Sequence, residues 1–211
     1  MSRILVVEDN PQFREGASKY LATREGIQVA YATNHDEAIR EIYTEPRMEG
    51  AVIDCFFPKV VGSKDLTLGY EAIQRMIEAD PRGRKTSPVA KALTQVGDIL
   101  GRDFAKFAAK NVRVNYSGEG DNYWALEQAM KESEANQPLG ILVAERAGEL
   151  GIPFILATST YHHDELTQPI QDYVSRRGWR LVDCGPNSEH EKETPEFWAR
   201  AFGELERRLR E

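Results

Sequence analysis

Three carboxylates follow two short apolar runs of this sequence, and they are the residues best suited to chemistry. Glu8 and Asp9 end the run that begins at Arg3, and Asp54 ends the run that begins at Gly50. Ligands of open parallel sheets bind at the carboxyl ends of strands, where the strand order reverses. If the two runs are neighbouring strands, the three acids converge on one pocket and repel one another. Mg²⁺, a hard cation that takes oxygen ligands, would relieve that repulsion.

The elements that must hold these acids can be predicted from the pattern of apolar residues. Short β-branched runs indicate buried strands, and longer stretches with apolar residues three or four positions apart indicate helices. We expect strands at 4–7, 27–31, 51–53, 154–157 and 179–182, and helices at 11–23, 66–79, 139–150, 165–176 and 195–210. A further helix is expected after Asn34 or Asp36, either of which can cap it. Strands that alternate with helices imply right-handed crossovers and a parallel sheet.

The acids and their neighbours resemble a known family, the receiver domains of response regulators, which accept phosphate in two-component signalling. Residues 4–10 resemble the family's first strand and acid pair. Residues 54–58 resemble its Asp-x-x-Met-Pro motif, with Asp54 at the phosphorylated position and Phe57 in place of Met. Residues 151–159 resemble its fourth strand, which is followed by the switch hydroxyl.

The resemblance covers residues 1–58 and 138–211, and it implies a flavodoxin-like, doubly wound α/β fold of five parallel strands in the order 2-1-3-4-5. Residues 59–137 do not fit it and are interpreted as a mostly helical insertion between strands three and four. One point stays open, because residues 66–79 could be the family's third helix instead of residues 139–150. Within the insertion the sequence also predicts a long amphipathic helix, a short strand and a second helix, at 89–110, at 112–116 and up to about 134.

The resemblance implies roles for five residues. Asp9 and Asp54 are expected to ligate Mg²⁺ directly, together with the backbone carbonyl of Phe56, and Glu8 is expected to assist. Asp54 would accept the phosphoryl group from a histidine kinase or a phosphotransfer protein. The hydroxyl of Thr158 would contact that group, with the following serine as the alternative.

Two positions depart from the family. Gly185 stands where the family has the lysine that pairs with the phosphoryl group, and Val182 or its neighbour stands where it has the switch aromatic. A loop lysine could replace the missing one, and the candidates are Lys59, Lys64 and Lys192. Phosphorylation and its readout depend on that lysine, and two alternatives to a phosphorylated receiver stay open. One is a degenerate receiver that binds partners without phosphotransfer, and the other is a Mg²⁺-dependent phosphohydrolase with His162 or His163 activating water.

Composition restricts the kind of partner and the compartment. The formal net charge of −7 disfavours direct binding to nucleic acid, and no apolar run is long enough to cross a membrane. The N-terminus leads directly into a strand, so no signal peptide is expected. Cys55 and Cys184 follow strands that are not neighbours in the family's sheet, so we expect reduced cysteines and a cytoplasmic protein.

We therefore expect a signalling protein and not an enzyme, whose output passes through contact with a downstream protein that the sequence does not identify. The sequence also leaves open whether the protein forms a homodimer. The motif His162-His163-Asp164 is interpreted as a solvated turn, in which Asp164 caps the next helix, in preference to a metal site. No glycine-rich loop follows the first strand, which argues against a nucleotide or flavin.

Overall fold

The structure is a computed structural model, and it describes residues 2–81, 99–101, 123–186 and 188–210 of the chain. The long helix expected at 89–110 and the strand expected at 112–116 lie outside the described residues, apart from residues 99–101. No helix among the described residues is long and apolar enough to span a membrane.

Five parallel strands form one sheet in the order β2-β1-β3-β4-β5. The strands are β1 (Ser2–Val7), β2 (Ile27–Ala32), β3 (Gly50–Asp54), β4 (Phe154–Ala157) and β5 (Leu181–Val182). Strands β3 and β4 are buried along their whole length, as expected for a parallel sheet covered on both faces. The flavodoxin-like, doubly wound α/β arrangement predicted from the sequence is confirmed. Strand β5 is shorter than predicted.

The described residues form seven α-helices and two short 3₁₀ helices. The α-helices are α1 (Pro11–Leu21), α2 (His35–Ile42), α3 (Thr67–Ala79), α6 (Trp124–Glu132), α7 (Gly140–Glu149), α8 (Gln168–Arg176) and α9 (Pro195–Arg208). The 3₁₀ helices are η1 (Glu134–Asn136) and η2 (Glu189–Glu193). Proline in the first turn starts α1 and α9, and the side chain of Asn34 caps α2 by accepting from the amide of Glu37 at 3.0 Å.

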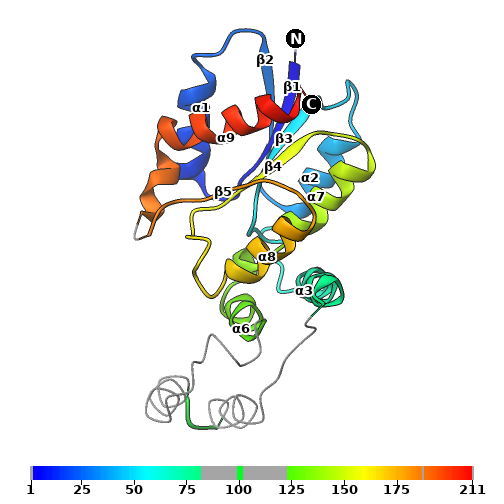
Figure 1. Cartoon of the computed structure of the whole chain (residues 1–211), viewed down its shortest axis with the longest axis vertical. Coiled ribbons are helices and arrows are strands. Elements are labelled where there is room, and N and C mark those ends of the chain that lie inside the picture. Colours follow the sequence, from blue (N-terminus) through cyan, green and yellow to red (C-terminus); the bar gives the residue numbers. More distant parts are fainter. Residues whose placement is uncertain (1, 82–98, 102–122, 187, 211) are drawn as a thin grey trace.

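Two helices cover one face of the sheet and three cover the other. Figure 1 shows α1 and α9 on one side, with α2, α7 and α8 on the opposite side. Successive side chains of a strand point to opposite faces, so Ile4 and Val6 pack with Trp198 of α9, while Leu5 and Val7 join the core under α2 and α7. Both helical layers therefore hold β1 in place, and with it the acids that follow it.

The connection from β3 to β4 runs through α3 and α6 before it reaches α7. Helix α7 packs on β3 and β4, whereas α3 contacts α6 and α8. Of the two candidates for the helix on the sheet between strands three and four, residues 139–150 therefore take that place. Figure 1 shows α3 and α6 beyond the end of the sheet at which β3 finishes. The division of the chain into a receiver-like part and an insertion at 59–137 stays a prediction.

Candidate functional site

The three acids lie together at the carboxyl ends of two neighbouring strands. Strands β1 and β3 pair in parallel with Val7 opposite Ile53, so that the residues after them emerge side by side. One carboxylate oxygen from each of Glu8, Asp9 and Asp54 lies within 4.8 Å of the others. The convergence expected from the sequence is thus present, and among the described residues no other group of three potential ligands meets this criterion.

A lysine that the sequence analysis named only as one of three candidates lies inside this cluster. The Nζ atom of Lys192 is 2.6 Å from Oδ1 of Asp54 and 2.6 Å from Oε2 of Glu8. The side chains of Lys192 and Glu8 are completely buried. Of the other two candidates, Lys59 pairs with Asp65 at 2.8 Å, and Lys64 is exposed. A cation therefore reaches the acids although Gly185 supplies none.

The backbone around Lys192 is held by α1 and α9. The indole Nε1 of Trp198 donates to the carbonyl of Lys192 at 2.8 Å. A Cβ atom at Gly16 of α1 would lie 2.5 Å from the carbonyl oxygen of Glu193, so only glycine lets η2 approach α1 this closely. The ammonium also lies 5.3 Å from the ring centroid of Phe13, a cation–π distance. The position of the ammonium therefore depends on tertiary packing, and not on the residues next to it in sequence.

The loop that carries Glu8 and Asp9 is also fixed. Arg14 donates from Nη1 to the carbonyls of Glu8 and Asp9 at 2.9 and 2.7 Å, and Oε1 of Glu8 accepts from the amide of Asn10 at 3.0 Å. Both carboxylate oxygens of Glu8 are thus engaged, one by an amide and one by Lys192. This carboxylate is positioned by the protein before any ligand is added.

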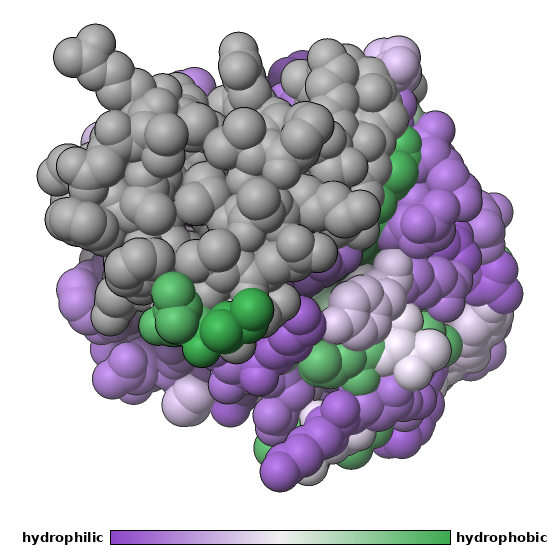
Figure 2. All heavy atoms as spheres, turned by 90° about the horizontal axis from the view of Figure 1, so that it is seen from below, coloured by the Kyte–Doolittle hydropathy of each residue, from purple (hydrophilic) through white to green (hydrophobic). Residues whose placement is uncertain are grey.

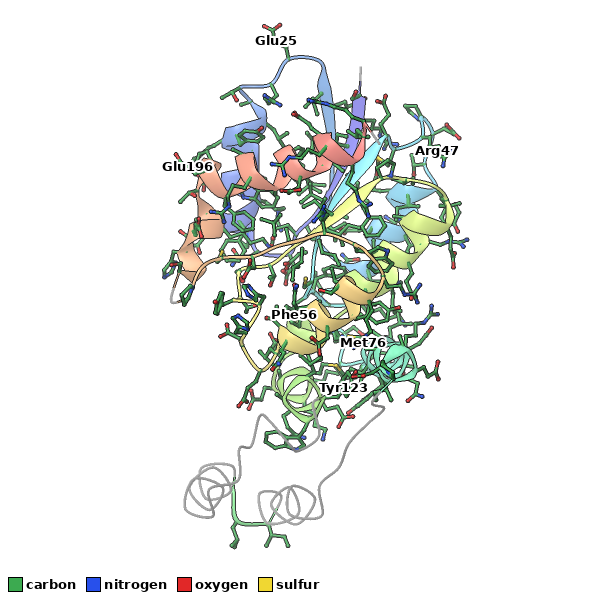
Figure 3. The ribbon with its side chains drawn as sticks, in the orientation of Figure 1. Glu25, Arg47, Phe56, Met76, Tyr123 and Glu196 are labelled. Atoms are coloured by element: carbon green, nitrogen blue, oxygen red, sulfur yellow. The ribbon has the colours of Figure 1, made fainter. Side chains whose placement is uncertain are left out.

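The third acid is supported by the close approach of α7. A Cβ atom at Gly140 would lie 2.1 Å from the carbonyl oxygen of Asp54, and the amide of Gly140 donates to the carbonyl of Cys55 at 3.2 Å. Phe56 lies just past the end of β3. Figure 3 shows it at the same end of the molecule as Met76 of α3 and Tyr123, which precedes α6. The expected role of the Phe56 carbonyl as a metal ligand stays a prediction.

The electrostatics of the cluster favour an additional cation. Burial raises the pKa of Glu8, and the nearby charge of Asp54 adds to the rise, while Lys192 opposes it. Burial and Asp54 together raise the pKa of Asp9 to about 7. Burial alone would lower the pKa of Lys192, but the two carboxylates outweigh it and the pKa is raised. The lysine is therefore charged at neutral pH, and a single ammonium faces three carboxyl groups whose pKa values are all raised.

Thr158 lies next to this cluster, directly after β4. Asp54 pairs with Ala157 in the register of β3 and β4, so Thr158 is the next residue along the neighbouring strand. It is completely buried, and its amide donates to the carbonyl of Val182 at 2.9 Å. Its hydroxyl lies 2.8 Å from the hydroxyl of Thr160. The register places Thr158 one residue beyond the partner of Asp54, and its contact with a phosphoryl group stays a prediction.

The two adjacent histidines form a different arrangement. The amide and the ring Nδ1 of His162 lie 2.9 and 2.7 Å from Oδ2 of Asp183, and its ring is tilted by 48° against that of His163, with the centroids 4.1 Å apart. The prediction that Asp164 caps α8 is wrong, since the N-cap residue is Thr167 and the Asp164 carboxylate accepts from the amide of Tyr161 at 3.0 Å. The tight turn over 161–164 uses that carboxylate and delays the start of the helix.

Comparisons with protein-family models and with curated proteins identify no relative. The case for a function consequently rests on the geometry of the site.

Proposed function

We propose that the protein is a receiver-like phosphoacceptor, in which Asp54 takes a phosphoryl group in the presence of Mg²⁺. The observation that carries the proposal is the buried Lys192–Asp54 pair inside an acidic cluster. A phosphoacceptor aspartate needs neighbouring acids for a metal ion and a fixed cation for the phosphoryl oxygens. Sequence alone supplied the first requirement and left the second open.

Asp54 is the nucleophile in this proposal. A carboxylate oxygen of Asp54 attacks phosphorus, so that an oxygen–phosphorus bond forms while the bond from phosphorus to the donor's imidazole nitrogen breaks. The imidazole leaves with the electron pair of that bond. Burial raises the pKa of Asp54, and the charge of Lys192 counteracts this rise, which favours the reactive anion.

Lys192 would also pair with the oxygens of the transferred group. Its ammonium is already desolvated and held by the protein, so no reorganisation is needed when negative charge arrives. It would thereby replace the lysine that is absent at Gly185, from a position in η2 instead of the end of β5. The hydroxyl of Thr158 would contribute a hydrogen bond to the same group.

The donor set fits Mg²⁺. Glu8, Asp9 and Asp54 offer carboxylate oxygens within 4.8 Å of one another, and the carbonyl of Phe56 would complete the set. Oxygen ligands without histidine or cysteine are typical of Mg²⁺ sites and not of zinc sites. When bound, the ion would neutralise charge on the phosphoryl oxygens.

We propose that the output passes through protein contact in the cytoplasm. Helices α3 and α6 lie past the carboxyl ends of the strands, at the end of the sheet that carries the acids (Figure 1). Seen from that end, the described surface is mostly hydrophilic, with small separate apolar areas (Figure 2). A histidine kinase or phosphotransfer protein would be the donor, and the downstream target is a further protein.

The test is phosphorylation with a small donor. We expect acetyl phosphate and Mg²⁺ to add one phosphoryl group to the wild-type protein, measured by intact mass, and to add none to Asp54→Asn. Glu25→Gln, which removes an exposed carboxylate, is the control and should be modified like wild type. Absence of modification in the wild-type protein contradicts the proposal.

A second candidate follows from the same lysine. Lys192 already occupies one oxygen of Glu8 and one of Asp54, so the site is partly neutralised without a metal. A degenerate receiver that binds partners without phosphotransfer would show no modification in this experiment and no Mg²⁺ binding in a separate calorimetric titration. Continuous release of phosphate from a phosphate ester would instead indicate the phosphohydrolase alternative.

A further inference from the structure

A chain of three threonine hydroxyls connects the proposed site to the start of α8. The hydroxyl oxygens of Thr158 and Thr160 are 2.8 Å apart, and the hydroxyl of Thr160 is also hydrogen-bonded to that of Thr167. The amide of Thr160 donates to the hydroxyl oxygen of Thr158 at 3.3 Å. Thr158 and Thr167 are both completely buried, and Thr160 between them is partly exposed.

The hydroxyl of Thr167 is used in an unusual way for its position. Thr167 is the N-cap residue of α8, where a threonine side chain ordinarily accepts from an amide of the first helical turn. No such capping bond is present, and the hydroxyl bonds to Thr160 instead. The carbonyl of Thr167 still accepts from the amide of Gln171 at 2.8 Å. Helix α8 thus has no side-chain cap at Thr167, because the hydroxyl of Thr167 belongs to the chain of hydroxyls instead.

Such a chain has a direction, because each hydroxyl carries one proton. A phosphoryl oxygen on Asp54 only accepts, so Thr158 would have to donate its proton to it. Thr158 could then no longer donate to Thr160, and Thr160 would have to donate back to Thr158. Thr160 would in turn lose its proton for Thr167, which would have to become the donor between the two. In the unmodified protein either oxygen of each pair can be the donor, so one new acceptor at the site would fix the direction of both bonds of the chain.

The resembled family has a switch aromatic on its fifth strand, and Val182 or its neighbour takes that place here. Val182 of β5 is buried and offers no side-chain hydrogen bond, so it cannot carry a polar change from Thr158 outward. The hydroxyl chain leaves Thr158 in another direction, along the loop from β4 to α8.

We infer that Thr160 and Thr167 are positioning residues that hold the hydroxyl of Thr158 and transmit the modification of Asp54 to the first turn of α8. This inference rests on the proposed function. A purely structural role would stabilise the loop between β4 and α8 equally before and after modification. The distinguishing property is therefore a response of α8 that depends on the hydroxyl of Thr160.

The test uses the full chain with Mg²⁺ and either acetyl phosphate or beryllofluoride. Hydrogen exchange of the Gln168 and Gln171 amides is measured before and after modification. We expect a several-fold change in exchange rate in the wild-type protein and in Thr160→Ser, which keeps the hydroxyl. We expect no change in Thr160→Val, although Asp54 is modified to the same extent. Thr23→Val, which removes a hydroxyl distant from the site in sequence, is the control and should respond like wild type.

Other outcomes separate the inference from the proposed function. A wild-type response in Thr160→Val, or no response in Thr160→Ser, overturns the inference and leaves phosphorylation intact. A modified wild-type protein whose α8 amides do not respond also overturns the inference alone. A wild-type protein that is not modified at all overturns the proposed function and the inference with it. If Thr160→Val does not fold, Thr167→Val tests the other end of the chain, with the same expected loss.

Discussion

The ammonium of Lys192 lies 2.6 Å from Oδ1 of Asp54, and 138 positions in the sequence separate the two residues. The same ammonium lies 2.6 Å from Glu8, and the Lys192 side chain is completely buried. Burying charges is costly unless they are paired, so each member of this group depends on the others. The pair links the segment after β5 to the ends of β1 and β3, which makes it part of the fold as well as part of the proposed chemistry.

Removal of the ammonium should destabilise the protein. Lys192→Met keeps a long side chain but leaves the buried carboxylates of Glu8 and Asp54 without their cation. Loss of one partner of a buried pair costs about 3–5 kcal/mol, so we expect the free energy of unfolding to fall by about that amount when divalent ions are chelated. Urea denaturation in EDTA measures it. Lys64→Met, at an exposed lysine, should change stability by less than about 0.5 kcal/mol. Equal stabilities of the two variants would contradict the ion pair.

Asp9 should make the metal-free protein less stable as the pH rises. Burial and the charge of Asp54 raise its pKa from 3.8 to about 7. The folded state therefore holds this proton more tightly than the unfolded state, and stability falls between about pH 4 and about pH 7 by up to ~1.4 kcal/mol per pH unit. Below pH 4 both states are protonated and above pH 7 both are ionised, so the contribution is constant there.

Asp9→Asn removes that penalty. In EDTA near pH 8 we expect the variant to be more stable than wild type by roughly 1–3 kcal/mol, and the difference should shrink toward pH 4. Mg²⁺ should stabilise the wild-type protein and not the variant, since binding to the folded state alone raises stability. Thermal denaturation with and without millimolar Mg²⁺ checks both statements. A variant that is less stable than wild type near pH 8 would refute the unfavourable charge at this position.

Gly16 should be important for stability and for phosphorylation, because its lack of a side chain leaves space for η2 to pack on α1. A Cβ at this position would lie 2.5 Å from the carbonyl oxygen of Glu193, next to Lys192, so Gly16→Ala must displace the segment that carries the lysine. We expect a loss of about 1–3 kcal/mol in stability and slower phosphorylation by acetyl phosphate, although no acid is changed. Gly203→Ala is the matched control, since nothing lies within 4 Å of its added Cβ and alanine favours a helix. That variant should be slightly stabilised and phosphorylated normally.

The sequence was sufficient to predict the strands that carry the acids of the site, but not the lysine that pairs with those acids. The apolar runs before Glu8 and Asp54 predict two neighbouring strands, and parallel strands necessarily bring their ends together. Lys192 follows no local pattern, because it lies in a polar segment, Ser188-Glu-His-Glu-Lys192, that reads as a solvated loop. Its burial arises from packing between distant elements, where the glycine at position 16 and the indole at position 198 hold η2 against α1 and α9.

The chain of threonine hydroxyls could not be predicted from the sequence for a similar reason. Thr158 could be singled out because it follows an apolar strand, but Thr160 and Thr167 lie in a turn-rich loop with no periodicity. Threonine in such a loop usually contacts nearby backbone groups, and nothing in the sequence shows that three hydroxyls meet. The expectation that Asp164 caps α8 failed on the same loop, since a local turn uses the carboxylate first. Loop hydrogen bonds depend on geometry that residue types alone do not determine.

Lys192 and a divalent ion should compete for the same oxygens. The ammonium contacts Oε2 of Glu8 and Oδ1 of Asp54, and both carboxylates belong to the proposed Mg²⁺ site. Removing the ammonium frees these two oxygens and adds one net negative charge, so Lys192→Met should bind Mg²⁺ at least tenfold more tightly, equivalent to about 1.4 kcal/mol. The same variant should be phosphorylated more slowly, because the phosphoryl oxygens lose a cation partner. Titration calorimetry with Mg²⁺ and intact mass after acetyl phosphate measure the two effects on one sample. Weaker Mg²⁺ binding in Lys192→Met would show that the lysine orients the acids for the metal and does not compete with it.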